Sequence, residues 1–407
     1  MTDPARVSRA LVDLIVVSHT VTFEGLPGLV AEYSSAVGLR RVVFFAVDLQ
    51  ETVLREVTGH GPDAGAGGLE LRVDGTLPGL AYQRVDLLPE PNTTPGEPGS
   101  RRWWVPMTDG VERLGVLRAD TDGDDEGARE ALRGLASTVA LLMLSKRSFS
   151  DSYARLVRTA PMNVAAEMQW NLTPPPAYAG HNVTIGAVSE PAYEIGGDAF
   201  DYALAGSTMH LAVFDAMGHD ATAGLTANVA VAACRNARRQ GADPVETSRV
   251  VERTLMEQFG IHRYATGILA ELDLDTGHLS WVNRGHPLPV LIRTGRWSKE
   301  LRCPPAGPMG TDLGLPITLC HDQLEPGDRL ALYTDGIIEA RDRNGHRFGR
   351  DRFIEFILRH HSGRLGLHET LRRLIHAVME HHAERLDDDA TVLLAEWRGG
   401  HQGKLTP

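Results

Sequence analysis

The chain has 407 residues, of which 42% are hydrophobic and 23% are charged, and its formal net charge is −12. This composition is typical of a globular protein, and the length predicts two or three domains. The acidic balance argues against broad electrostatic binding to nucleic acid or to an anionic membrane. No run of about 18 apolar residues occurs, and Asp13 interrupts the apolar stretch near the start. We therefore expect no membrane span and no signal peptide, and we predict a cytoplasmic protein.

Residues 1–124 are predicted to form a small α+β module. Helical periodicity covers Val7–Val17 and Leu29–Ala36, and a β-rich run follows at 41–48, with further strand-like pieces at Trp103–Met107 and Leu114–Leu117. Pro, Gly and Ser predict a long surface loop over residues 88–100. This order of elements resembles a GAF-type sensory domain, and a generic regulatory or dimerising module fits it equally well.

Residues 125–160 are predicted to form a helical linker. Eight positions follow one another in steps of three and four residues, and seven of them are apolar: Leu132, Leu135, Val139, Leu142, Lys146, Phe149, Tyr153 and Leu156. This a/d pattern favours a coiled coil that joins two copies into a homodimer. A single amphipathic helix packed on its own domain is the alternative, and Lys146 at a core position weakens the coiled coil.

From residue 161 to 398 the chain alternates strands and helices in an α+β manner, and a tail at 399–407 follows. The expected strands are Val183–Val188, Met209–Phe214, Thr266–Leu274, Leu279–Asn283, Leu288–Ile292, Arg329–Tyr333 and Thr391–Trp397. The expected helices are Ala221–Arg239, Pro244–Phe259, Asp351–His360 and Leu367–His382. The cysteines, Cys234, Cys303 and Cys320, are odd in number and lack CxxC spacing, so we expect free thiols rather than a disulfide or a zinc site.

Four aspartates of this region share one local setting, at strand ends or turns and mostly near glycine. They are Asp198 after Gly196-Gly197, Asp215 after an apolar run, Asp335 before Gly336, and one of the run Asp387-Asp388-Asp389. Each alone is more often a turn residue than a catalytic one. Several carboxylates delivered to one rim of a sheet would repel one another unless hard cations such as Mg²⁺ or Mn²⁺ neutralised them.

The words around these aspartates carry a family resemblance. The segments EIGGDAFD (194–201), DAMGHD (215–220), NRGHPLP (283–289), LYTDGIIEA (332–340) and DDAT (388–391) stand in the order found in PPM-type serine/threonine phosphatases. The resemblance is to the bacterial SpoIIE and RsbU subclass and covers about residues 160–398. It implies a β-sandwich of two antiparallel sheets flanked by helices, with two Mn²⁺ or Mg²⁺ ions at one end.

The resemblance also implies which residues bind the metals. Asp198, Asp215 and the Ala216 backbone carbonyl correspond to ligands near the bridging site, and Asp335 and Asp388 to the two C-terminal ligands. Glu194 is a further candidate for the metal shell, and a plain loop glutamate explains it as well. Asp388 is chosen over its two neighbours by register.

The phosphate-binding arginine of the eukaryotic branch has no clear counterpart in this sequence. Arg284, Arg263 and His219 stay open as phosphate contacts, and we expect Arg284 and Arg263 to be solvated on the surface. For His219 and His286 we expect structural hydrogen bonds rather than acid catalysis.

Three functions are compatible with the sequence. The leading one is a regulatory phosphatase that hydrolyses phosphoserine on a partner protein, under control of the N-terminal module. The resemblance implies that this partner is an anti-sigma-factor antagonist of the STAS type. The second is a catalytically weak interaction protein that keeps the fold. The third is another two-metal enzyme such as a nucleotidyl cyclase, which the order of the motifs disfavours.

Overall fold

The computed structural model describes residues 4–90, 101–194, 196–218, 220–293, 295–362, 366–382, 386 and 388–399. The chain divides into two compact units, Met1–Pro161 and Met162–Pro407. Both have α+β architecture, and every strand pair in the described ranges is antiparallel. No helix in the described part of the chain has the length and hydropathy needed to span a bilayer.

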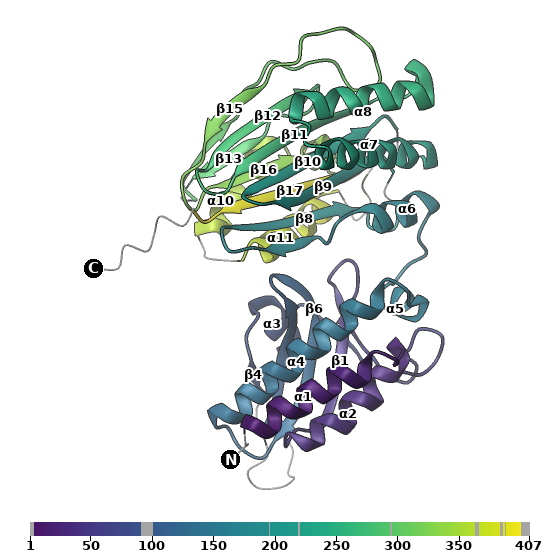
Figure 1. Cartoon of the computed structure of the whole chain (residues 1–407), viewed down its shortest axis with the longest axis vertical. Coiled ribbons are helices and arrows are strands. Elements are labelled where there is room, and N and C mark those ends of the chain that lie inside the picture. The colour runs from purple at the N-terminus through teal and green to yellow at the C-terminus, as the bar shows by residue number, and fades with distance from the viewer. Residues whose placement is uncertain are drawn as a thin grey trace, which may run out of the picture. The chain divides into compact units, whose positions relative to one another are not determined.

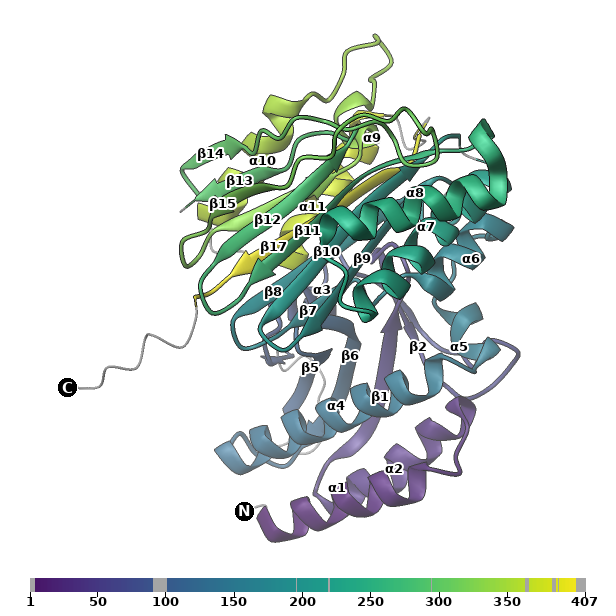
Figure 2. The same cartoon turned by 45° about the horizontal axis from the view of Figure 1, so that its top comes forward.

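The first unit is built on one six-stranded sheet with the order β3-β2-β1-β6-β5-β4. Its strands are β1 (Arg40–Val47), β2 (Val53–Glu56), β3 (Glu70–Arg72), β4 (Leu88–Pro89), β5 (Arg101–Asp109) and β6 (Glu112–Thr121). Its helices are α1 (Pro4–Ser18), α2 (Leu26–Ala36), α3 (Leu77–Arg84), α4 (Glu126–Arg147) and α5 (Asp151–Leu156), with a 3-10 turn η1 at Phe23–Gly25. Helices α1, α2 and α4 lie together on one face of the sheet (Figure 2).

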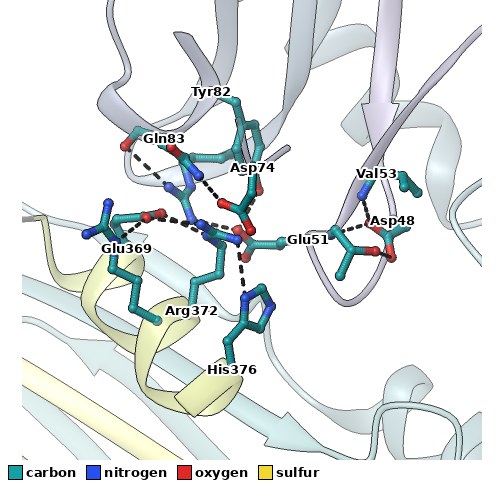
Figure 3. A network of polar contacts seen from close by, with 12 residues as sticks. Asp48, Glu51, Val53, Asp74, Tyr82, Gln83, Glu369, Arg372 and His376 are labelled. Carbon is teal, nitrogen blue, oxygen red and sulfur yellow. Dashed lines mark hydrogen bonds and ion pairs between the residues drawn. The ribbon is translucent and has the colours of Figure 1, made fainter. Parts of the chain in front are cut away.

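The alternation of side chains along the strands gives this sheet a core on each face. Phe44 packs with the helices α1, α2 and α4, whereas its neighbour Phe45 packs with Tyr82 and Trp104 on the face of α3. The turn after β1 is held by Asp48, whose carboxylate accepts hydrogen bonds from the N–H groups of Thr52 and Val53 at 2.7 and 2.8 Å (Figure 3).

The helix predicted as a linker packs within the first unit. The side chains of Leu132, Leu135, Val139 and Leu142 are buried in the core beside α1 and α2. Lys146 is buried, and its Nζ donates to the carbonyl of Ser18 at 2.9 Å, which compensates part of the cost of burying the charge. Most positions of the three-four pattern thus pack on the helix's own domain, whereas Phe149 is 68% exposed. Dimerisation through this helix stays a prediction.

The second unit contains two further sheets, with the orders β15-β12-β11-β10-β9 and β14-β13-β16-β17-β8-β7. The strands are β7 (Ala177–Ala179), β8 (Val183–Glu190), β9 (Asp198–Ala205), β10 (Thr208–Ala216), β11 (Ala265–Asp273), β12 (His278–Arg284), β13 (Val290–Arg293), β14 (Trp297–Glu300), β15 (Cys320–Gln323), β16 (Arg329–Tyr333) and β17 (Ala390–Trp397). The helices are α6 (Val164–Leu172), α7 (Ala221–Arg239), α8 (Pro244–Phe259), α9 (Asp335–Glu339), α10 (Arg350–Ser362) and α11 (Leu367–His381), with a 3-10 turn η2 at Gly260–His262.

These elements form four layers, helix–sheet–sheet–helix. Inward side chains of both sheets, such as Leu211 of β10 and Leu332 of β16, share one core between the sheets. Helices α7 and α8 cover the outer face of the β9–β12 sheet, and α10 and α11 cover the outer face of the other (Figure 1). On α11, the buried Arg372 donates to Glu369 at 3.0 Å (Figure 3).

Helices α7, α8, α10 and α11 follow the sequence prediction closely. Helices α7 and α8 begin and end as expected, and Asp243 caps α8 by accepting from the N–H of Glu246 at 2.8 Å. Strand β9 was not expected, and neither were the short edge strands β14 and β15.

The expectation of three free thiols is wrong. Cys303 and Cys320 form a disulfide with Cα atoms 5.9 Å apart, and only Cys234 is a free, buried thiol. The two partners are 17 residues apart in sequence. Cys320 is brought into place by pairing of β15 with β12, where it lies opposite Trp281. The pairing depends on this tertiary arrangement, which the spacing of the cysteines does not reveal.

Candidate active site

The two sheets of the second unit each contribute two of the predicted aspartates. Asp198 is the first residue of β9 and lies opposite Asp215, the last residue but one of β10. Asp335 follows β16 and starts α9, and Asp388 stands just before β17, the strand that pairs with β16. The two sheets are linked at this end, because Thr334, next to Asp335, donates to Asp198 at 2.6 Å, and Asp389, next to Asp388, accepts from the Asp198 N–H at 3.3 Å.

Burial and mutual repulsion perturb the acidity of this cluster. Burial raises the pKa of Asp198 well above its ordinary value, and the charges of Asp215 and Asp389 raise it further. Burial also raises the pKa of Asp215 to about 7, with added repulsion from Asp335, Asp388 and Asp389. The pKa of Asp335 is raised by burial and then by Asp388. Burial and repulsion therefore both disfavour the charged form of these carboxyl groups in the metal-free protein.

The donor set fits a hard divalent cation. Within the described ranges, none of these five aspartates has an ion pair with a lysine or arginine, so no basic side chain neutralises them. Carboxylate oxygens and a backbone carbonyl are the ligands that Mg²⁺ and Mn²⁺ prefer. As the side chains stand, no three His, Cys, Asp or Glu residues of the described segments are grouped tightly enough to hold an ion.

Asp198 is oriented from the opposite sheet. The Thr334 hydroxyl donates to its Oδ2 at 2.6 Å, and the same hydroxyl accepts from the Thr391 N–H at 2.9 Å. Gly197, the preceding residue, is needed for a close approach, because a Cβ there would lie 2.3 Å from the Ala216 carbonyl oxygen. That carbonyl is the backbone ligand predicted from the resemblance.

Asp389 has a role that the sequence reasoning missed. It is buried, and its Oδ2 accepts hydrogen bonds from the N–H groups of Gly196, Gly197 and Asp198 at 2.8, 2.6 and 3.3 Å. These bonds lower the pKa of Asp389, whereas burial, the larger effect, raises it. Asp389 thus holds the segment of Gly196 and Gly197 before β9, the glycine loop. Its neighbour Asp388 is exposed and available as a ligand.

The other candidate residues of the sequence analysis lie in different surroundings. Glu194 is exposed in the turn before the glycine loop. His219 and Asp387 lie outside the described residues. Arg263 is partly buried and donates from Nη1 to the Met217 carbonyl at 3.2 Å, in the loop that follows Asp215.

The expectation that Arg284 is a solvated surface residue is wrong. Its side chain is 3% exposed, its Nε donates to the Gly307 carbonyl at 2.7 Å, and its Nη2 pairs with Glu252 of α8 at 2.5 Å. Because every arm of the guanidinium is engaged inside the protein, Arg284 is a structural residue. It ties α8 to the loop between Cys303 and Cys320.

His286 makes the structural hydrogen bonds expected of it. Its Nδ1 lies 2.8 Å from the Thr266 hydroxyl and its Nε2 lies 3.1 Å from the Tyr333 carbonyl oxygen. Burial lowers the pKa of His286 to about 4, and the bond to Tyr333 opposes this shift. The ring is therefore neutral near pH 7.

Comparison with known proteins is consistent with this geometry. Residues 205–398 match the family model described as Stage II sporulation protein E (SpoIIE). This part of the chain is therefore similar in sequence to the SpoIIE family. The match includes Asp215, Asp335 and Asp388 and begins after Asp198.

Two curated relatives come from Bacillus subtilis (strain 168). Phosphoserine phosphatase RsbU is 23% identical over 189 residues, which are 45% of this chain and 55% of RsbU. Phosphoserine phosphatase RsbP is 26% identical over 184 residues, which are 44% of this chain and 45% of RsbP. The chain thus spans about half the length of these two relatives.

Solved structures of similar domains include the SiaA-PP2C domain of Pseudomonas aeruginosa. It is 21% identical, with a TM-score of 0.47 and coverage of 53% of this chain and 85% of that one. The phosphatase domain of SpoIIE from Bacillus subtilis with a fragment of its regulatory domain is also 21% identical. Its TM-score is 0.46, and it covers 54% of this chain and 63% of that one.

Proposed function

We propose that the protein is a metal-dependent serine/threonine phosphatase that hydrolyses phosphoserine on a partner protein. The observation that carries the proposal is the arrangement of Asp198, Asp215, Asp335 and Asp388 at the end where Thr334 links the two sheets, with no basic side chain of the described residues to neutralise them. The match of residues 205–398 to the SpoIIE family model also supports it.

Two Mn²⁺ or Mg²⁺ ions would be held by these four aspartates and the Ala216 carbonyl. Such a pair supplies an activated water and neutralises charge on the phosphoryl group. The protein itself orients the ligands: Thr334 fixes the carboxylate of Asp198, and Asp389 fixes the backbone of the glycine loop. The exposed Asp388 leaves the site open to a phosphorylated side chain.

The partner we propose is an anti-sigma-factor antagonist of the STAS type, because the motifs resemble the RsbU and SpoIIE subclass. Both Bacillus relatives bear the name phosphoserine phosphatase, which supports a phosphoserine substrate. Such a substrate would place the protein in the cytoplasm. The disulfide between Cys303 and Cys320 is uncommon in that compartment.

The first unit is proposed to be a GAF-like regulatory module. A six-stranded antiparallel sheet with helices on both faces supports this reading. The predicted homodimer would form through the helical segment 125–160 of this unit. Deleting residues 1–161 should change phosphatase activity or oligomeric state, as measured by phosphate release and light scattering; unchanged values for both would contradict a regulatory role.

The activity is tested with the full chain, a phosphoserine peptide and Mn²⁺. We expect phosphate release that stops on addition of chelator and is absent in Asp215→Ala. The matched control is Asp351→Asn, which alters an aspartate whose side chain is 98% exposed at the start of α10. Absence of release with Mn²⁺ or Mg²⁺ would contradict the proposal and favour a non-catalytic interaction protein. Release of pyrophosphate from a nucleoside triphosphate would indicate a cyclase.

A further inference from the structure

His286 sits in a turn that fixes the direction of its ring. The turn follows β12, and Gly285 has a φ of +72°, which favours glycine. The Asn283 side chain brackets the turn: its Nδ2 donates to the His286 carbonyl at 2.9 Å, and its Oδ1 accepts from the His286 N–H at 2.8 Å. Both residues are buried. The backbone of His286 is therefore held on both sides.

Both ring nitrogens of His286 are used inside the protein. A backbone carbonyl can only accept, so Nε2 carries the proton and donates to Tyr333. Nδ1 then accepts from the Thr266 hydroxyl. With the ring buried and both nitrogens engaged, His286 has no position left from which to exchange a proton with substrate.

The two partners of His286 belong to different sheets and lie next to the aspartates. Thr266 of β11 is directly opposite Asp215 in the β10–β11 pairing. Tyr333 ends β16 two residues before Asp335. The imidazole thus bridges the strand beside one aspartate pair and the strand that leads into the other.

We propose that His286 is a positioning residue that sets the spacing between the pair Asp198–Asp215 and the pair Asp335–Asp388. The inference rests on the proposed function, because only a shared metal centre requires that spacing. Two ions that act on one phosphoryl group lie about 3.5–4 Å apart. Ligands delivered by separate sheets must then be held in register to within about 0.5 Å. The Thr266–His286–Tyr333 bridge joins the sheets at this point.

The test uses Thr266, where single substitutions keep or remove one hydrogen bond. Thr266→Val removes the hydroxyl at nearly constant volume, and Thr266→Ser retains it. His286→Gln removes the ring. Thr254→Val, in α8, is the matched control, because it removes a hydroxyl that bonds within its own helix, to the Val250 carbonyl. The Mn²⁺ affinity of the full chain is measured by calorimetry at a temperature at which every variant is folded. The melting temperature of each metal-free variant is measured as well.

We expect Mn²⁺ affinity to fall roughly 10- to 100-fold in Thr266→Val and His286→Gln, as for other residues that orient metal ligands. Thr266→Ser should recover most of the affinity, and Thr254→Val should keep it. A residue that merely stabilises the fold would lower the melting temperature and leave the Mn²⁺ affinity unchanged. Wild-type affinity in Thr266→Val and His286→Gln would therefore overturn the proposal.

The outcomes also separate this inference from the proposed function. Mn²⁺ binding by the wild type without phosphate release would overturn the function alone, and the variant affinities would still decide the role of His286. Phosphate release with unaltered affinities in the variants would overturn the positioning role alone. A wild type that binds no Mn²⁺ would overturn both. If His286→Gln does not fold, the Thr266→Val and Thr266→Ser pair gives the answer.

Discussion

Replacing Asp215 by Asn should stabilise the metal-free protein at neutral pH while removing its metal binding. The pKa of Asp215 is raised to about 7, first by burial and then by the charges of Asp335, Asp388 and Asp389. A carboxyl group whose pKa is higher in the folded state than in the unfolded state binds more protons when folded. Metal-free stability must then fall as pH rises from about 4 to about 7, and stay low above that range.

The size of the effect follows from the same shift. One pKa unit corresponds to about 1.4 kcal/mol, so a rise from 3.8 to about 7 costs at most about 4 kcal/mol above pH 7. Asp215 is partly exposed, and water screens part of this cost, so we expect about 2 kcal/mol. For a unit of this size that is a gain of roughly 4–8 °C in melting temperature for Asp215→Asn.

The assay is thermal unfolding in chelator between pH 5 and pH 8.5, repeated with Mn²⁺. In chelator, the difference between Asp215→Asn and the wild type should grow as pH rises. With Mn²⁺, the wild type should gain stability by mass action and the variant should not. Asp351→Asn serves as the control and should follow the wild type throughout. If Asp215→Asn melts at or below the wild-type temperature in chelator at pH 8, the repulsion inferred for this cluster is wrong.

Three further predictions concern groups around the site. Asp389→Ala should lower the free energy of unfolding by about 2–3 kcal/mol in urea titrations, because three backbone N–H groups lose their acceptor. Asp389→Asn keeps an acceptor oxygen and should cost clearly less. Equal costs for the two variants would contradict the role of these bonds. Arg284→Met should cost about 3 kcal/mol in the same assay, since it leaves Glu252 without its positively charged partner, and a neutral result would contradict a buried pair. Reduction of the Cys303–Cys320 disulfide should lower stability by up to about 3 kcal/mol, measured by melting with and without dithiothreitol, and Cys303→Ser should abolish that difference.

Most of the long helices of the second unit could be predicted from local sequence patterns. Helix α8 combines an N-cap aspartate, proline at its first position and an apolar stripe, and its bounds are as expected. Strand β9 escaped prediction because Asp198 and Asp201 interrupt its apolar character. Asp201 is fully buried, and it is paired with Arg235 and Arg238 of α7. Those arginines are more than thirty residues away, so the sequence around Asp201 shows only an aspartate in an apolar run.

The candidate site likewise contains some residues that local motifs predict and others whose surroundings come from distant segments. The order of the motifs predicts Asp198, Asp215 and Asp335 as metal ligands. The pairing of β9 with β10 places Asp198 opposite Asp215, whereas Asp335 follows a strand of the other sheet. The environments of Asp389 and Arg284 depend on groups from distant segments, namely the N–H groups of the glycine loop and Glu252 of α8. A charged residue beside a turn looks solvated in sequence. Only the packing around it determines whether it is buried and paired.

The division of the aspartates between two sheets has a mechanical consequence. Each pair is held within its own sheet by strand pairing, as Asp198 and Asp215 are by β9 and β10. The sheets themselves meet through apolar side chains, which set distance less strictly than hydrogen bonds do, because dispersion contacts have no preferred direction. Directional links at the aspartate end include the bond from Thr334 to Asp198, the bonds that Asp389 accepts from Gly196 and Gly197, and the bonds of His286 with Thr266 and Tyr333. The geometry available to a metal pair therefore depends on these hydrogen bonds as well as on the aspartates that would bind the metals.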